Sequence, residues 1–500
     1  MRTQSHSPYD GRLVGDVGQT SPDELAETVS RATAAGPRVG GASPTERRAW
    51  LDAVADTLDA HQDELAELAD SESALGVERL RGEVHRAAEQ LRFYGRVAAE
   101  GSWLGVTVDE ATEVSPRLVR INRPLGPVAV FGASNFPLAF GVLGNDTGSA
   151  VAAGCPVVAK AHSAQVSTCR RLAELATSAL AEAGAPDGTF GMVVGRQAGV
   201  DLVRADGIKA VGFTGSQGGG LALWRVANER EVVIPVYAEM GTVNLAVLTP
   251  SGAAGLDDVA KGFAASFTLG SGQFCTKPGL LFAPAGLGAA ERVAEALQHL
   301  ALDPKMLTKA IAADVAAGIE QLEAAGAKVV ARVHGSEQGW AADAAVLSAP
   351  VSALTSGSRL LEECFGAVAL VVEYADRAEL DAAIGRMQGS LAGAVFGGGS
   401  GDEDAAHAVE LLSRQVGRVT VGDWPTGVAW NWAQHHGGPW PATSNPATTS
   451  VGAAALDRFV RPVTFQSVPA KSLPVPVRPA VAPDNPWRIP RRINGVLTTP

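Results

Sequence analysis

From Pro124 onwards the sequence alternates short apolar runs with helical periods, and this alternation restricts the possible folds more than any other feature. Buried strands are predicted at residues 128–132, 156–160, 191–194 and 208–214, and small-residue helices separate them. Strands that alternate with helices form a parallel sheet with helices on both faces, and ligands bind at the carboxyl ends of its strands. The sequence therefore predicts an α/β fold built on a doubly wound parallel sheet.

A second α/β segment is expected to open with the short strands 235–239 and 244–248 and to continue to about Trp424. It contains Cys275, in a glycine- and serine-bearing turn. Four cysteines in 500 residues are too few for a disulfide framework, so a lone cysteine in such a turn is a candidate nucleophile. Small neighbours would let a carbonyl approach its sulfur. The alternative is a buried cysteine that packs as a small hydrophobe.

The flanking segments have different patterns. Residues 21–96 show helical periods and helix-start signals. Residues 103–122 alternate in polarity and predict a long hairpin, which needs a partner surface to be stable, so we expect a subunit contact there. Beyond Arg461 the chain is rich in proline and predicts an extended tail.

Composition excludes several classes of protein. The net charge of −12 and the pI near 5.3 argue against binding to nucleic acid or to an anionic membrane. The sequence contains no run of about 18 apolar residues, so no membrane span is expected. The N-terminus lacks the apolar region of a signal peptide. The cysteines are widely spaced, which is typical of a reducing cytoplasm and gives no zinc-site pattern, so we expect a cytoplasmic protein without a metal.

Four turns carry polar groups directly after predicted strands. Asn135 could donate to a developing oxyanion, although asparagine is also common in ordinary turns. Lys160 closes a buried strand, where a lysine either has a function or extends its ammonium to solvent. The glycine-rich turn 213–220 precedes a helix and suits a pyrophosphate. Glu239 ends an apolar strand, where desolvation could raise its pKa to that of a general base, although a structural acid is the alternative.

Together these turns resemble the aldehyde dehydrogenase superfamily, over roughly residues 43–466. Six motifs occur in the order that the family has. They are N-F-P at 135–137, F-T-G-S at 213–216, E-M-G at 239–241, G-Q-F-C at 272–275, E-x-F-G at 363–366 and H-G-G-P at 436–439.

The resemblance implies three parts. A Rossmann-like nucleotide-binding domain would comprise residues 1–102 and 123–238, and an α/β catalytic domain with the nucleophilic cysteine would comprise residues 239–425. Residues 103–122 and 455–500 would form a small β element for oligomerisation, in a homodimer or homotetramer.

The resemblance also implies a role for individual residues. Cys275 would attack an aldehyde, Asn135 and the Cys275 backbone N–H would hold the oxyanion, and Glu239 would activate the water that hydrolyses the resulting thioester. The residues implied in nucleotide binding are Lys160, His162, Ser163, Gly215, Ser216, Gly220, Glu363 and Phe365.

One departure from the family pattern bears on the cofactor. Many NAD-dependent members have a glutamate that binds the adenosine 2′-hydroxyl at the position of Ser163, which here follows His162. A carboxylate would repel a 2′-phosphate, whereas serine or histidine could bind it. NADP is therefore expected to be preferred, with NAD possible.

Several longer segments, among them N-P-W-R-I-P-R-R-I-N-G at 485–495, resemble the 2,5-dioxopentanoate (α-ketoglutaric semialdehyde) dehydrogenase subgroup. The subgroup implies oxidation of 2,5-dioxopentanoate to 2-oxoglutarate in sugar-acid breakdown. The alternatives are a long-chain or aromatic aldehyde dehydrogenase, for which an apolar tunnel would be evidence, and a non-catalytic relative with the same fold. A thiol hydrolase would need a histidine base, and no motif predicts a histidine near Cys275.

Overall fold

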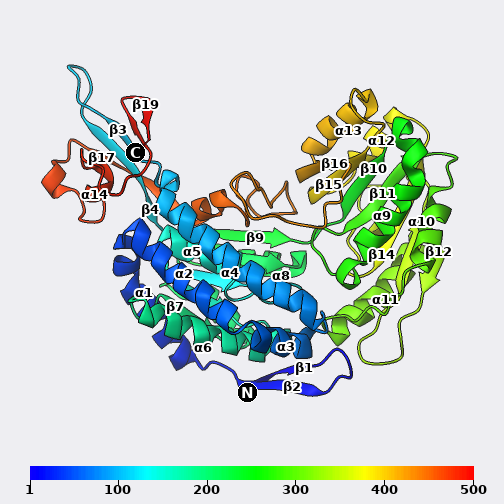
Figure 1. The fold of residues 1–500 in the computed structure, drawn as a ribbon, viewed down its shortest axis with the longest axis horizontal. Coiled ribbons are helices and arrows are strands. Elements are labelled where there is room, and N and C mark those ends of the chain that lie inside the picture. Colours follow the sequence, from blue (N-terminus) through cyan, green and yellow to red (C-terminus); the bar gives the residue numbers. More distant parts are fainter. Residues whose placement is uncertain (500) are drawn as a thin grey trace.

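The computed structural model describes residues 1–499, which form two α/β units and a small projecting β element (Figure 1). In the first unit, five parallel strands pair in the order β7-β6-β5-β8-β9. They are β5 (Val128–Phe131), β6 (Val157–Lys160), β7 (Phe190–Val193), β8 (Ala210–Gly215) and β9 (Val236–Met240). This confirms the predicted doubly wound parallel sheet.

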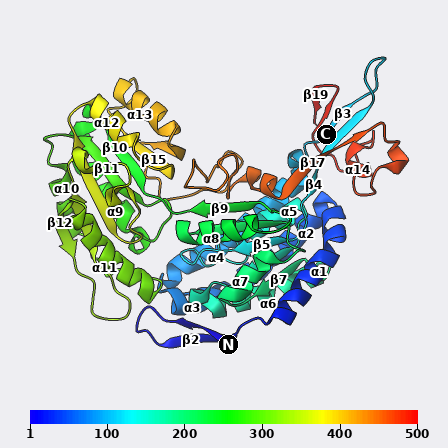
Figure 2. The same cartoon turned by 180° about the vertical axis from the view of Figure 1, so that it is seen from behind.

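Successive residues of β5 point to opposite faces of this sheet. Val128 and Val130 pack among residues of one core, and Ala129 and Phe131 pack in another. The first core is covered by α2 (Pro44–Ala60), α4 (Val77–Glu100), α5 (Asn145–Ala153) and α6 (Val166–Glu182), with α3 (Gln62–Ser73) beside them. The opposite face carries α1 (Pro22–Gly41), α7 (Arg196–Arg204) and α8 (Gln217–Asn228), which Figure 2 shows from behind.

The strand expected at 235–239 does not open the second segment. It is β9, the edge strand of the first sheet, in register with β8 from Val211↔Val236 to Gly215↔Met240. An apolar run shows that a strand is buried but does not show which sheet it joins. The pairing aligns the carboxyl ends of β8 and β9.

The second unit contains a seven-stranded sheet in the order β12-β13-β14-β11-β10-β15-β16, parallel except for β12. Helices α9 (Leu256–Thr268) and α10 (Ala289–Gln298) cover one face. Helices α11 (Lys309–Ala324), α12 (Arg377–Ile384) and α13 (Glu403–Ser413) cover the other. The strands are β10 (Asn244–Leu248), β11 (Pro278–Pro284), β12 (Lys328–Val333), β13 (Ala344–Ser348), β14 (Val368–Tyr374), β15 (Ser390–Phe396) and β16 (Val416–Val421).

The third sheet has the order β17-β4-β3-β18-β19 and projects from the first unit (Figure 1). The predicted hairpin forms β3 (Thr107–Asp109) and β4 (Leu118–Pro124). The tail does not merely extend over the surface, because it supplies β17 (Val460–Gln466), β18 (Arg491–Ile493) and β19 (Val496–Thr498), with α14 (Arg478–Val481) between β17 and β18.

The N-terminus forms a hairpin of β1 (Arg2–His6) and β2 (Leu13–Gly18), which the polar sequence did not predict. Its turn is anchored to the second unit, where the Trp340 N–H donates to the Pro8 carbonyl at 2.9 Å. Across residues 1–499, every helix is too short or too polar to cross a membrane.

Candidate active site

Cys275 lies just beyond α9, after a turn that needs unusual backbone angles. Gly270 and Gly272 have φ values of 57° and 71°, and a Cβ on Gly272 would collide with the backbone of Gly366. Beyond the turn, the Asn244 amide donates to the Cys275 carbonyl at 2.8 Å. The glycines and Asn244 thus fix the backbone of Cys275, a residue of intermediate exposure.

A cavity of about 550 Å³ brings the catalytic candidates and most of the nucleotide-binding candidates together. It lies at the carboxyl ends of β5, β6, β8 and β9, where a doubly wound sheet binds its ligands. Ser163 and Gly220 do not line it. Ser163 is exposed and follows the lining residue His162, and a Cβ on Gly220 would meet Met240 Sδ at 2.7 Å, so Gly220 lets α8 pack against β9. The predicted residues that line the cavity are Asn135, Lys160, His162, Gly215, Ser216, Glu239, Cys275, Glu363 and Phe365.

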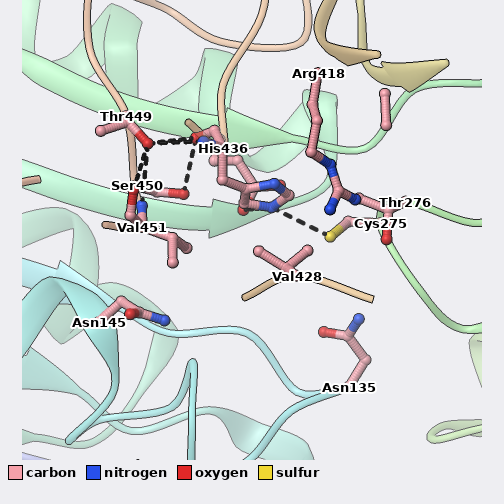
Figure 3. A network of polar contacts seen from close by, with 12 residues as sticks. Asn135, Asn145, Cys275, Thr276, Arg418, Val428, His436, Thr449, Ser450 and Val451 are labelled. Carbon is pink, nitrogen blue, oxygen red and sulfur yellow. Dashed lines mark hydrogen bonds and ion pairs between the residues drawn. The ribbon is translucent and has the colours of Figure 1, made fainter. Parts of the chain in front are cut away.

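A histidine lies beside the cysteine, although no sequence motif indicated one there. His436 Nε2 is 3.6 Å from the Cys275 sulfur and 3.2 Å from Glu239 Oε2 (Figure 3). The His436 side chain is buried, and its backbone N–H donates to Thr449 Oγ1 at 2.7 Å. His436 can therefore exchange a proton with the thiol or with the carboxylate.

Cys275 lies in surroundings that oppose ionisation. Burial raises the pKa of its thiol well above the ordinary cysteine value, and the negative charges of Glu239 and Glu363 raise it further. The thiol is thus protonated at neutral pH and needs a base before it can act as a nucleophile. Neither oxygen of the buried Glu239 accepts a well-formed hydrogen bond from residues 1–499. With Oε2 beside His436, Oε1 is left to accept from a water molecule.

Asn135 follows β5 and points towards Cys275 (Figure 3). Its Nδ2 donates one hydrogen bond, to the Gln273 carbonyl at 2.8 Å. Because an amide nitrogen carries two hydrogens, the second remains available to a negatively charged oxygen on a carbon bonded to the Cys275 sulfur. Asn135 is thus held in place by the segment that carries the nucleophile.

The other part of the cavity has groups that match a nucleotide. Glu363 Oε1 is buried without a hydrogen-bond partner in residues 1–499, as expected of an acceptor for ribose hydroxyls. Burial raises the pKa of Glu363 to about 7, against the opposing charge of Lys277. Burial and Lys160 lower the pKa of His162 to about 4, so this imidazole is neutral at pH 7. Ser216 Oγ caps α8 by accepting from the Gly219 N–H at 3.3 Å, beside the other free N–H groups of this helix end.

Comparison with known proteins identifies the family. The model of the aldehyde dehydrogenase family matches residues 1–444. The chain belongs to the aldehyde dehydrogenase family. Solved structures share its fold. The structure of PnpE in complex with nicotinamide adenine dinucleotide has a TM-score of 0.80 at 20% identity, over 93% of this chain and 94% of the other. An aldehyde dehydrogenase from Bacillus cereus has a TM-score of 0.81 at 20% identity, over 93% of each chain.

Two curated aldehyde dehydrogenases are similar along nearly the whole chain. Alpha-ketoglutaric semialdehyde dehydrogenase 2 of Azospirillum brasilense is 39% identical, over 98% of this chain and 94% of its own. Alpha-ketoglutaric semialdehyde dehydrogenase of Acinetobacter baylyi is 36% identical, over 96% of this chain and 92% of its own.

In this aldehyde dehydrogenase, the segment that follows β16 lies beside Cys275, a contact that was not predicted from the sequence. Arg418 donates to the carbonyls of Pro425 and Gly427, and Thr276 Oγ1 donates to the Thr426 carbonyl at 3.0 Å. Figure 3 shows Val428 and Arg418 beside Cys275. Arg418 thus holds the loop 425–428 against the residues that carry the nucleophile.

Proposed function

We propose that the protein oxidises 2,5-dioxopentanoate to 2-oxoglutarate, with NADP as the preferred electron acceptor. The observation that carries this proposal is the cluster of Cys275, His436 and Glu239, whose three donor atoms lie within 4.8 Å of one another. The spacing would also allow a metal ion, but a coordinated thiolate and carboxylate would be unavailable for attack and for proton transfer. The choice of substrate is supported by the names of the two relatives that match nearly the whole chain, both of which are alpha-ketoglutaric semialdehyde dehydrogenases.

The reaction begins with ionisation of the thiol. His436 Nε2, 3.6 Å from the sulfur, takes the proton, and the imidazolium that forms lies 3.2 Å from the Glu239 carboxylate. Opposite charges at that distance stabilise each other strongly in a buried site. The protein thereby obtains a thiolate although burial opposes one.

The thiolate then adds to the aldehyde carbon, and the carbonyl oxygen becomes an alkoxide. The free amide hydrogen of Asn135 and the backbone N–H of Cys275 donate to that oxygen. A bound nicotinamide would supply the hydride acceptor for this step, so that loss of hydride from the former aldehyde carbon leaves a thioester on Cys275. Glu239 takes a proton from water, the water oxygen attacks the thioester carbon, and the C–S bond breaks to release the carboxylate and the Cys275 thiol.

The nucleotide would be held by residues of both units. Lys160 and Glu363 would hold the adenosine and nicotinamide riboses, Gly215 and Ser216 would hold the pyrophosphate at the start of α8, and Phe365 would help to hold the nicotinamide. Preference for NADP follows from Ser163 and His162, because neither repels a 2′-phosphate.

A long-chain or aromatic aldehyde is the second candidate substrate. It is favoured by Phe136 and Phe140, which line the cavity with their ring centres 5.6 Å apart. An apolar wall alone does not separate the two substrates, because the two methylene carbons of 2,5-dioxopentanoate would also pass along it.

We also propose the three parts predicted from the sequence as domains, with the third sheet as a subunit contact of a homodimer or homotetramer. In support, Val114, Val496 and Leu497 leave 96%, 65% and 59% of their surface exposed on that sheet or its loop. Light scattering during size-exclusion chromatography tests this. A monomer, or an oligomer that persists when all three residues are changed to serine, would contradict it.

The reaction is tested with NADP and with NAD on 2,5-dioxopentanoate, succinic semialdehyde, a long-chain aldehyde and an aromatic aldehyde. We expect the largest kcat/KM for 2,5-dioxopentanoate with NADP, and one 2-oxoglutarate formed for each NADPH. A larger kcat/KM for the long-chain or aromatic aldehyde would replace the proposed substrate. No reduction of either nucleotide by any aldehyde would contradict the enzymatic activity.

A further inference from the structure

A buried lysine follows the nucleophile by two residues and takes no part in the proposed reaction. Lys277 leaves 3% of its surface exposed, although a lysine is rarely buried unless an opposite charge pairs with it. Its ammonium has no carboxylate within 4.0 Å in residues 1–499. Burial lowers the pKa of Lys277, and the more distant charge of Glu363 opposes this effect. The charge of Lys277 must therefore be stabilised by other groups.

Backbone carbonyls enclose the ammonium of Lys277. Its Nζ donates to the carbonyls of Cys364 at 2.6 Å, Gly366 at 2.9 Å and Val368 at 3.0 Å. An ammonium has three hydrogens, so each hydrogen has one acceptor. Hydrogen bonds from a charged donor are about twice as strong as those between neutral groups. The side chain thus ties the segment 364–368 to the segment that carries Cys275.

The tied segment includes two of the nucleotide-binding candidates. Glu363 directly precedes the first of the three carbonyls, Phe365 lies between the first and the second, and both residues line the cavity. Residues 362–367 form neither a helix nor a strand. Because no regular hydrogen-bond ladder holds this loop, its position depends on individual contacts such as those of Lys277.

The loop is also fitted closely between two other segments. A Cβ on Gly272, in the turn before Cys275, would collide with the backbone of Gly366. A Cβ on Gly241, directly after β9, would collide with the Glu363 carboxylate. A small shift of the loop would therefore move Glu363 relative to both Cys275 and the first unit.

We propose that Lys277 positions the loop 363–366, and with it the nicotinamide half of the nucleotide, relative to Cys275. This inference rests on the proposed function, in which Glu363 and Phe365 hold that half. Lys277 does not line the cavity and acts through these two residues, so it is a positioning residue. Since Lys277 lies two residues from Cys275, one short segment fixes both the nucleophile and the loop.

The first test compares the whole nucleotide with its adenosine half. Lys277→Met keeps a long side chain but removes the charge and the donors. We expect its Kd for NADP, measured by calorimetry, to rise at least about tenfold, since one hydrogen bond from a charged group contributes about this much. The Kd for adenosine 2′,5′-bisphosphate should stay within about twofold, because that ligand binds far from the loop.

The same variant is tested for an intact nucleophile. Without nucleotide, iodoacetamide should alkylate Cys275 of Lys277→Met within about twofold of the wild-type rate, because Asn244 still holds the Cys275 backbone. Lys261→Met changes an exposed lysine of α9 and is the matched control. It should match the wild type in both binding measurements and in alkylation.

A second variant tests the role of the donors by rescue. Lys277→Ala removes the three carbons and the nitrogen beyond Cβ, and n-propylammonium contains the same atoms. Purification in n-propylammonium keeps the carbonyls paired during folding, and dialysis then removes the amine. The affinity for NADP should fall on dialysis and recover when n-propylammonium is added again. Tetramethylammonium, which has the charge but no N–H donor, should not restore it.

Several results would overturn the inference. An unchanged Kd for NADP in Lys277→Met would do so, as would equal losses for NADP and the bisphosphate or a parallel loss of alkylation, which would indicate a role in folding alone. In Lys277→Ala, no recovery with n-propylammonium, or equal recovery with tetramethylammonium, would do so as well.

Failure of the proposed function has a different outcome. The binding measurements use no aldehyde, so another preferred aldehyde would replace the proposed substrate and leave the inference standing. If the wild type binds NAD more tightly than NADP, the proposed cofactor falls, and NAD and AMP take the places of NADP and the bisphosphate. If the wild type binds neither nucleotide, both fall.

Discussion

The Nε2 atom of His436 lies 3.6 Å from the sulfur of Cys275. Because burial raises the pKa of the thiol, a base at this position determines how much thiolate forms. His436→Gln is therefore expected to slow the alkylation of Cys275 by iodoacetamide at pH 7 and to lower kcat by about 10²–10⁴-fold, the usual range for loss of a general base. His435→Gln changes the neighbouring, half-buried histidine and should leave both rates near the wild-type values. Equal alkylation rates in the two variants would remove His436 from the mechanism.

Asn135 is expected to act on the oxyanion rather than on the stability of the fold. Asn135→Ala removes one donor and should lower kcat by about 10²–10³-fold, as loss of a single oxyanion donor does elsewhere. The KM for the nucleotide should change little. Ser134→Ala, in the same turn, controls for disturbance of the cavity wall. A kcat within about threefold of the wild type in Asn135→Ala would show that other groups hold the oxyanion.

Glu363 should make the unliganded protein less stable at alkaline pH. Burial raises the pKa of its carboxyl from 4.5 to about 7, so the folded protein binds this proton more tightly than the unfolded chain does. The stability that this difference contributes is present at low pH and is lost as the pH rises from 4.5 to about 7. Glu363→Gln should thus raise the thermal midpoint without nucleotide at pH 8 by more than at pH 5, and also raise the KM for the nucleotide. Glu362→Gln, at an exposed neighbour, should do neither. An equal shift of the midpoint at both pH values would contradict the role of ionisation.

The choice between the two nucleotides is expected to depend on Ser163. A glutamate at this exposed position would repel a 2′-phosphate and could bind a 2′-hydroxyl. Ser163→Glu should therefore lower the ratio of kcat/KM for NADP to that for NAD by at least about tenfold, through the KM for NADP. Ser163→Gln, which adds a side chain of similar size without charge, should change the ratio less. A wild-type enzyme that uses NAD better than NADP would show that this position does not select the cofactor.

Much of the scaffold could be predicted because local periodicity determines it. The strand predicted at 244–248 coincides with β10, and the helical region predicted at 21–96 contains α1 and α2, each of which begins with a capping box. Pairing over long distances in the chain could not be predicted. The pattern did not show that β9 completes the first sheet, or that β17 pairs with β4 from Val460↔Pro124 to Gln466↔Leu118.

In the site too, residues within local motifs could be predicted, whereas contacts between distant parts of the chain could not. The sequence motifs predicted Cys275, Glu239 and Asn135 as catalytic candidates, and these three residues line one cavity. The sequence also contained His436 within H-G-G-P, but 161 residues separate it from Cys275 and nothing in the motif indicates their contact.

The most direct test of the central claim is to trap the acyl group on Cys275. Glu239→Gln keeps the nucleophile but lacks the base that activates water, so the thioester should form and persist. Glu239→Gln is mixed with NADP and 2,5-dioxopentanoate, quenched in acid within one turnover of the wild type, and analysed by intact and peptide mass spectrometry. We predict one NADPH and one acyl adduct for each active site, with the adduct on the peptide that contains Cys275. NADPH formed without an adduct on that peptide, or an adduct on another residue, would contradict the account.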